Sequence, residues 1–173
     1  WMRDVPPKDG PRAEPAVVFQ ACSGTDAGPH GYDLLLENGY LTARMFRHWP
    51  GNGIGVRATT PVPKNTWTHV AVTYDGSSRA AGLQIYLNGV PVRQEIERDR
   101  LVKGTGQHTL VFGQRFRDKG FKGGQIDEAA IFNRALSPLE VGQLAGGKLA
   151  EALSAPKQHE AALREVYFSA LDP

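Results

Sequence analysis

The clearest pattern of apolar and polar positions lies in residues 67–74. Val70, Val72 and Tyr74 alternate with residues that face the other side of an extended backbone. A period of two is typical of a β-strand with one buried face. An Asp-Gly pair, which favours a turn, follows directly. We therefore expect a strand over residues 67–74.

The next segment repeats this alternation and ends in a hairpin signal. Leucine and isoleucine alternate with polar or aromatic residues over 83–87, and Asn88-Gly89 comes next. Asn-Gly suits a type I′ turn, because both central residues of that turn need a positive φ. Residues 90–93 then run back. Together with residues 67–74, these segments predict three consecutive antiparallel strands.

Most of the remaining chain also favours short strands. Residues 94–103 are charged and weakly patterned, and they fit either a long strand end or a crossover. Many short strands separated by turn residues indicate an all-β, antiparallel two-sheet sandwich. The other predicted strands are residues 16–22, 32–37, 40–46, 54–59, 108–113 and 126–132.

The C-terminal part has a helical pattern. Ser137, Pro138 and Glu140 form a helix start with a capping box, and the helix is expected to end at Gly146-Gly147. Residues 148–154 and 157–171 also read as helical. We expect a sandwich domain over residues 1–147, and a helical linker or the start of another domain over residues 148–173.

Two motifs carry a family resemblance. The first is Trp67 with the strand that ends in Tyr-Asp-Gly, followed by a strand that ends in Tyr-Leu-Asn-Gly, and the second is residues 124–137, Gly-Gln-Ile-Asp-Glu to Ala-Leu-Ser. The chain resembles laminin-G-like, concanavalin A-type jelly rolls over roughly residues 1–146. This fold carries lectins, glycanases, adhesion modules and spacers, so the resemblance implies the fold and little about function. It also implies that Trp1 ends an early strand, that the first strand is missing, and that the domain is a module of a larger secreted bacterial protein.

The amino-acid composition excludes only a few classes of function. The 173 residues contain 40% apolar residues and have a formal net charge of +2, which does not argue for nucleic acid as a partner. Cys22 is the single cysteine, so no internal disulfide can form. No apolar run approaches the ~20 residues that span a bilayer. We predict neither a nucleic-acid nor a membrane partner.

A basic loop is the first candidate binding site. Arg115 and Arg117 share it with two lysines, Lys119 and Lys122. Arginine binds planar anions through two hydrogen bonds, which suits the sulfate or carboxylate groups of an acidic glycan. The alternative is a solvated surface with local ion pairs. We expect the basic residues of 93–103 to lie near this loop.

Arg47, His48 and Trp49 form the second candidate site. A tryptophan in a loop can stack on a sugar ring while arginine and histidine supply polar contacts. The alternative is that Trp49 covers the edge of the sandwich.

Catalytic and metal sites are weaker candidates. Glu95, Glu97 and Asp99 alternate, so a regular strand would place all three on one face, as a glycanase requires of its carboxylates. Arg93, Arg98 and Arg100 are interleaved with them, and the apolar and aromatic surroundings that raise the pKa of a catalytic acid are lacking, so we predict no catalytic residue. The histidines are isolated, and no metal ligand set is predicted.

Pentraxin relatives bind calcium after a strand end that matches Phe112-Gly113-Gln114, but here arginines follow. Calcium stays open at four other carboxylates, Asp26, Asp33, Asp75 and Asp118.

These observations favour a non-catalytic recognition module in an extracytoplasmic multidomain protein. The expected partners are a neutral or anionic polysaccharide and neighbouring domains of the same protein, with no cofactor. Two other functions remain open: a structural domain that docks its neighbours without a glycan, and a degenerate glycanase.

Overall fold

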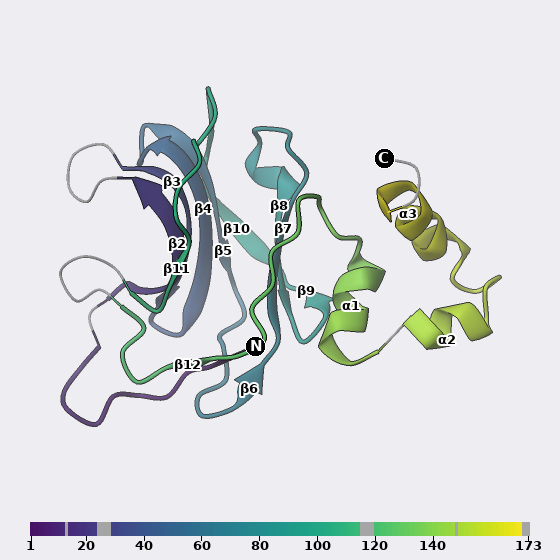
Figure 1. Cartoon of the computed structure of the whole chain (residues 1–173), viewed down its shortest axis with the longest axis horizontal. Helices are drawn as coiled ribbons and strands as arrows, with labels where there is room; N and C mark the ends of the chain where they lie inside the picture. The colour runs from purple at the N-terminus through teal and green to yellow at the C-terminus, as the bar shows by residue number, and fades with distance from the viewer. Residues whose placement is uncertain (13, 24–28, 115–119, 148, 171–173) are drawn as a thin grey trace.

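The protein folds as two stacked layers of β-strands with three helices beside the second layer (Figure 1). The computed structural model describes residues 1–12, 14–23, 29–114, 120–147 and 149–170. The first layer is an antiparallel sheet with the order β10-β5-β4-β3-β2-β11. Its strands are β2 (Ala16–Ser23), β3 (His30–Glu37), β4 (Tyr40–His48), β5 (Asn52–Ala58), β10 (Gln94–Arg100) and β11 (Val111–Phe112).

The second layer contains two shorter sheets. One has the order β7-β8-β9, and the other has the order β12-β1-β6. A 3-10 turn, η1 (Ala80–Gly82), precedes β8. The strands are β1 (Met2–Arg3), β6 (Trp67–Thr68), β7 (Val70–Tyr74), β8 (Leu83–Leu87), β9 (Val90–Pro91) and β12 (Gln125–Ile126).

The core lies between the two layers and follows the period of two in each strand. Val70, Val72 and Tyr74 pack against this core, as their alternation predicts. The predicted antiparallel two-sheet sandwich is therefore confirmed. Central core residues are Leu34, Leu36, Leu41, Ala43, Ile54, Val56, Leu83 and Ile85.

Several strands differ from the prediction in their extent. The segment 67–74 divides into β6 and β7 around His69, and 94–103 resolves as strand β10 over its first seven residues. The predicted strands 108–113 and 126–132 were too long, since β11 and β12 contain two residues each. A strand persists only where a neighbour satisfies its backbone groups. For β12 that neighbour is β1, which is itself two residues long.

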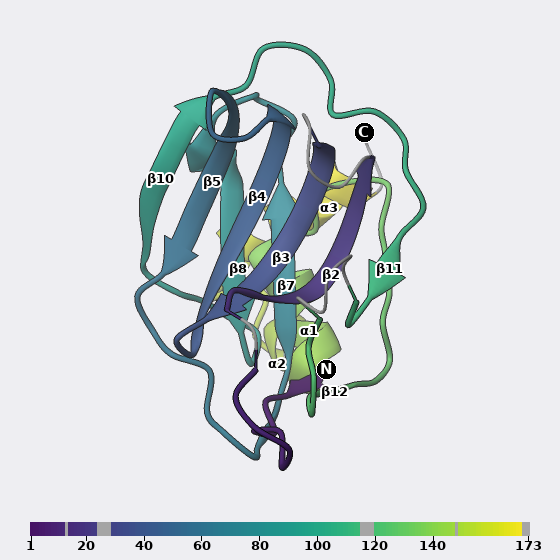
Figure 2. The ribbon, with the colours of Figure 1, turned by 90° about the vertical axis from the view of Figure 1, so that its left-hand side faces the viewer.

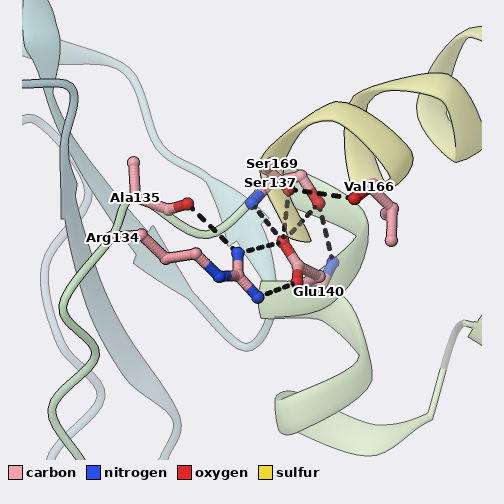
Figure 3. Close-up of polar contacts among 6 residues, drawn as sticks. All are labelled: Arg134, Ala135, Ser137, Glu140, Val166 and Ser169. Atoms are coloured by element: carbon pink, nitrogen blue, oxygen red, sulfur yellow. Dashed lines mark hydrogen bonds and ion pairs between the residues drawn. The ribbon is translucent and has the colours of Figure 1, made fainter. Parts of the chain in front are cut away.

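The helices are α1 (Pro138–Gly146), α2 (Leu149–Ser154) and α3 (Glu160–Ala170). The predicted capping box is present: the Ser137 side chain accepts a hydrogen bond from the Glu140 amide, and the Ser137 amide donates to the Glu140 carboxylate at 2.8 Å (Figure 3). The β8–β9 turn approaches α1 closely, because a Cβ on Gly89 would lie 2.9 Å from the Gly142 Cα. Glycine, with φ +77°, permits both the turn and this approach.

Candidate functional site: the outer face of the large sheet

The face of the six-stranded sheet that points away from the core carries a dense set of polar and aromatic side chains. Alternation places these residues opposite the core leucines and valines of the same strands. Figure 2 looks at this sheet with the second layer behind it. We call the surface the outer face, and it consists of Asp33, Leu35, Glu37, Tyr40, Thr42, Arg44, Phe46, Gly53, Gly55 and Arg57.

An ion pair lies at the centre of the outer face. Arg44 donates from Nε to Asp33 Oδ1 at 2.8 Å and from Nη2 to Asp33 Oδ2 at 2.5 Å. The two side chains are only 13% and 1% exposed. Burial opposes the charge of Arg44, but the hydrogen bond and charge of Asp33, with a smaller contribution from Glu97, raise its pKa above the usual value. The pair is thus a fixed, charged feature of the sheet.

The Trp49 indole packs against the neighbouring strand β5. A Cβ on Gly55 would lie 2.7 Å from the Trp49 Cη2, and one on Gly53 would lie 3.2 Å from its Cε3. The Arg44 guanidinium carbon is 4.8 Å from the Trp49 ring centroid, and Phe46 packs against the ring at 6.1 Å. Two glycines without side chains therefore give the indole its place on the sheet.

A second arginine, carboxylate and aromatic group lies further along the same face. Arg57 Nη1 donates to Glu37 Oε2 at 2.8 Å, and its guanidinium carbon is 5.4 Å from the Tyr40 ring centroid. Residues 40 and 44 are separated along β4 by about 13 Å at ~3.3 Å per residue. The outer face thus presents two partly exposed aromatic rings, each beside an arginine whose charge is already paired.

The candidate triplet Arg47, His48 and Trp49 belongs only in part to the outer face. Arg47 and His48 are exposed at the end of β4, and the pairing with β5 shifts between Phe46 and His48. Trp49 lies on the sheet beside Arg44. Of the triplet, Trp49 is the residue that joins the outer face.

Arg115 and Arg117, the candidate residues of the basic loop, lie outside the described residues. The expectation that their loop lies near residues 93–103 also falls outside the described residues, while β11, which precedes the loop, and β10 occupy opposite edges of the large sheet (Figure 2). Lys122, which belongs to the same predicted loop and is described, accepts a hydrogen bond from Arg12 Nε on its carbonyl.

The three alternating carboxylates of residues 95–99 do not share one face of β10. The register shifts between Ile96 and Arg98, so Glu97 is an extra residue. Glu95 pairs with Arg57 of the outer face, whereas Asp99 pairs with Ile54 of the core face. Asp99 accepts a hydrogen bond from the Ala80 amide at 2.7 Å. A single bulge thus separates carboxylates that a regular strand would align.

Within the described residues, no group of three histidine, cysteine or carboxylate side chains is arranged to hold a metal ion.

Hydrogen bonds from Ser77 lower the pKa of Asp75, and Arg134 with Ser137 lowers the pKa of Glu140 to about 2. Both shifts stabilise carboxylates, which is opposite to what a general acid requires. Cys22 is half-buried, and its Sγ donates to the Tyr32 carbonyl at 3.3 Å.

Sequence reasoning missed most of the outer face. Asp33, Arg44 and Arg57 were available from the alternation within the predicted strands 32–37, 40–46 and 54–59. Polar residues that recur on the non-core side of adjacent strands were the signal. The pairing between strands, which the sequence alone does not provide, brings them together.

The comparison with known families decides the relationship of this chain. The concanavalin A-like lectin/glucanases superfamily, in its laminin G type, matches residues 5–142. The chain belongs to this superfamily. The name of the superfamily includes both lectins and glucanases, so membership is compatible with sugar recognition and with catalysis.

Other comparisons add little to the superfamily. No curated protein matches the chain. A similar solved structure is the S-layer domain-containing protein (residues 221–444) from Clostridium thermocellum, with 22% identity and a TM-score of 0.34. The match covers 75% of this chain and 64% of that one. Among the described residues, no helix is both long and apolar enough to cross a membrane.

Proposed function

We propose that this superfamily member is a non-catalytic polysaccharide-binding module and that its binding surface is the outer face around Trp49. The observation that carries the proposal is the Trp49 indole lying over Gly53 and Gly55, with the Arg44 guanidinium 4.8 Å from its ring. A flat, partly exposed ring suits the apolar face of a sugar, and paired polar groups beside it suit hydroxyl groups.

The second aromatic group supports a polymer rather than a single sugar. Tyr40 with Arg57 lies on the same face as Trp49 with Arg44. Both arginines are paired with carboxylates, which favours an uncharged ligand at this surface. An anionic glycan at Arg115 and Arg117 is the variant of this proposal that the basic loop suggests.

The setting of the module is part of the proposal. We place it in an extracytoplasmic multidomain protein, with residues 1–147 as the recognition domain and residues 148–173 as a helical linker or the start of another domain. Neighbouring domains of the same protein are then additional partners.

Affinity electrophoresis against neutral and sulfated polysaccharides, with calcium and with chelator, tests the proposal. We expect neutral polymers to retard the wild type, and Trp49→Ala to remove the retardation. Trp67→Ala is the matched control, because Trp67 is exposed on the other layer. Retardation by sulfated polymers alone, lost in Arg115→Ala/Arg117→Ala but kept in the Arg79→Ala control, would move the site to the basic loop. Absence of retardation by every polymer would contradict polysaccharide binding.

A further inference from the structure

Two histidines from distant parts of the chain meet at one end of the large sheet. The His30 and His108 ring centroids are 4.7 Å apart, and the ring planes are inclined by 75°. His30 begins β3, and His108 lies in the segment between β10 and β11, which runs from one edge of the large sheet to the other (Figure 2). Both residues are half-buried, so solvent reaches them. We call His30 and His108 the histidine pair.

Neighbouring oxygen atoms determine which ring nitrogens of the histidine pair keep a lone pair. His108 Nε2 lies 3.2 Å from the Thr105 carbonyl oxygen, which can only accept, so Nε2 donates and Nδ1 keeps its lone pair. The Ser23 hydroxyl lies 2.6 Å from His30 Nδ1 and 3.1 Å from its Nε2. The shorter contact assigns the hydrogen of His30 to Nδ1, which leaves the lone pair at Nε2.

This hydrogen bonding matches that of histidines that bind metal ions. In such histidines one ring nitrogen binds the ion, while the other donates to an oxygen that fixes the orientation of the ring. In the histidine pair, the oxygens of Ser23 and Thr105 take the second role. The lone pairs of His30 Nε2 and His108 Nδ1 are then available to an ion.

The backbone at Gly106 packs closely on both rings. A Cβ at this position would lie 2.8 Å from His108 Nε2 and 3.2 Å from His30 Cδ2. Gly106 has a φ of +82°, which glycine adopts without strain. A residue without a side chain therefore lets the segment before β11 hold the two rings next to each other.

The separation of the two rings suits a single tetrahedral ion. Zn–N bonds are about 2.0–2.1 Å long, which places the centroids of two imidazoles on one ion about 5 Å apart. The observed 4.7 Å is close to this value. Imidazole nitrogen is a ligand that suits Zn²⁺, Cu²⁺ and Ni²⁺, whereas Ca²⁺ takes oxygen ligands.

We propose that the histidine pair binds one divalent transition-metal ion of this group through His30 Nε2 and His108 Nδ1. Water completes the coordination of the ion, because the pair is open to solvent. The ion joins the segment between β10 and β11 to the start of β3. It thereby fastens a long connection to the end of the large sheet.

Equilibrium dialysis of the 173-residue chain against Zn²⁺ tests the proposal. We expect one Zn²⁺ per chain, which excess Ca²⁺ does not displace. His30→Gln and His108→Gln keep a polar side chain of similar size, and each should weaken binding by at least about a hundredfold. Ser23→Ala should weaken it by about tenfold, because only the partner that orients His30 is lost. His159→Gln is the matched control, since His159 is also half-buried but lies just before α3.

Two further measurements accompany the dialysis. Circular dichroism of each variant shows whether it is folded. Long-range ¹H–¹⁵N spectra of the wild type identify the bound atoms without any substitution, and Zn²⁺ should shift the signals of His30 Nε2 and His108 Nδ1.

Three results would overturn the proposal. The first is absence of Zn²⁺ binding by the folded wild type. The second is binding that persists in both glutamine variants of the histidine pair, or that shifts other histidine nitrogens instead, since the ion would then lie elsewhere. The third is one ion per two chains together with a dimer in sedimentation, because the ion would then bridge two copies. None of these readouts depends on polysaccharide binding.

Discussion

Asp33 and Arg44 face each other across β3 and β4 as directly opposed residues, and their two hydrogen bonds of 2.8 and 2.5 Å form a bidentate pair under the aromatic side chains of the outer face. The Asp33 carboxylate is nearly inaccessible, with 1% of its side chain exposed. A charge in this position depends on its partner, because water cannot replace the lost interaction.

Arg44→Met should therefore destabilise the fold strongly. It leaves the Asp33 carboxylate buried without its partner, and we expect a loss of about 3–5 kcal/mol in the free energy of unfolding. Urea unfolding followed by circular dichroism measures it. The double variant Asp33→Leu/Arg44→Met is the control and should recover most of the loss, because no buried charge remains. A double variant as unstable as the single one would show that packing, and not the charge, is responsible.

Gly55→Ala should impair polysaccharide binding although Trp49 is still present. The new Cβ would lie 2.7 Å from the Trp49 Cη2, so the ring must tilt away from the sheet. We expect retardation in affinity electrophoresis to weaken by about tenfold, which corresponds to roughly 1.4 kcal/mol. Gly51→Ala is the control, because its Cβ would meet only an ordinary contact, 3.9 Å from His48. Equal binding by both variants would contradict the role of the ring position.

Glu140→Gln should lower stability near neutral pH but not in acid. Hydrogen bonds from Arg134 and Ser137 lower the pKa of Glu140 from 4.5 to about 2. Because the folded pKa lies below the unfolded one, the contribution is complete above pH 4.5 and disappears as the pH falls toward 2. We expect a difference from wild type of about 1 kcal/mol at pH 7, the usual size for a helix cap.

The Glu140 prediction is checked by urea unfolding of both proteins between pH 2 and 7. Glu160→Gln serves as the control, because Glu160 is exposed in the first turn of α3. A wild type-to-variant difference that stays constant with pH would contradict the proposed linkage.

Gly89→Ala should cost more stability than Gly39→Ala. Both glycines follow asparagine in hairpin turns, with φ of +77° and +84°, so each loses about 1–2 kcal/mol from the left-handed backbone. Only at Gly89 would the new Cβ lie 2.9 Å from the α1 residues Gly142 and Ala145. We expect a further loss of about 1–3 kcal/mol from this crowding, measured by urea unfolding. Equal losses would mean that α1 moves away at no cost.

Periodicity predicted the layered sandwich because alternation depends only on local sequence. It identified the core side of β7, and the Ser137 capping box followed from residue types three positions apart. The predictions that were wrong depended on how strands pair with each other. Strand β12 is short because it pairs with β1, which has only two residues. The bulge at Glu97 reverses the faces of β10, and no feature of the amino-acid composition indicates it. The outer face forms only when β3, β4 and β5 pair in a particular register, and this register cannot be predicted from the sequence around Trp49.

The Glu140 carboxylate also has a mechanical consequence. Its Oε2 accepts from Arg134, Ser137 and, at 3.2 Å, the Ser169 hydroxyl of α3 (Figure 3). The Glu140 carboxylate therefore links α3 to the first turn of α1 and to the segment that leads back to the sandwich, in addition to the other contacts between α1 and α3. Protonation of this carboxylate would weaken the link between the last helix and the sandwich.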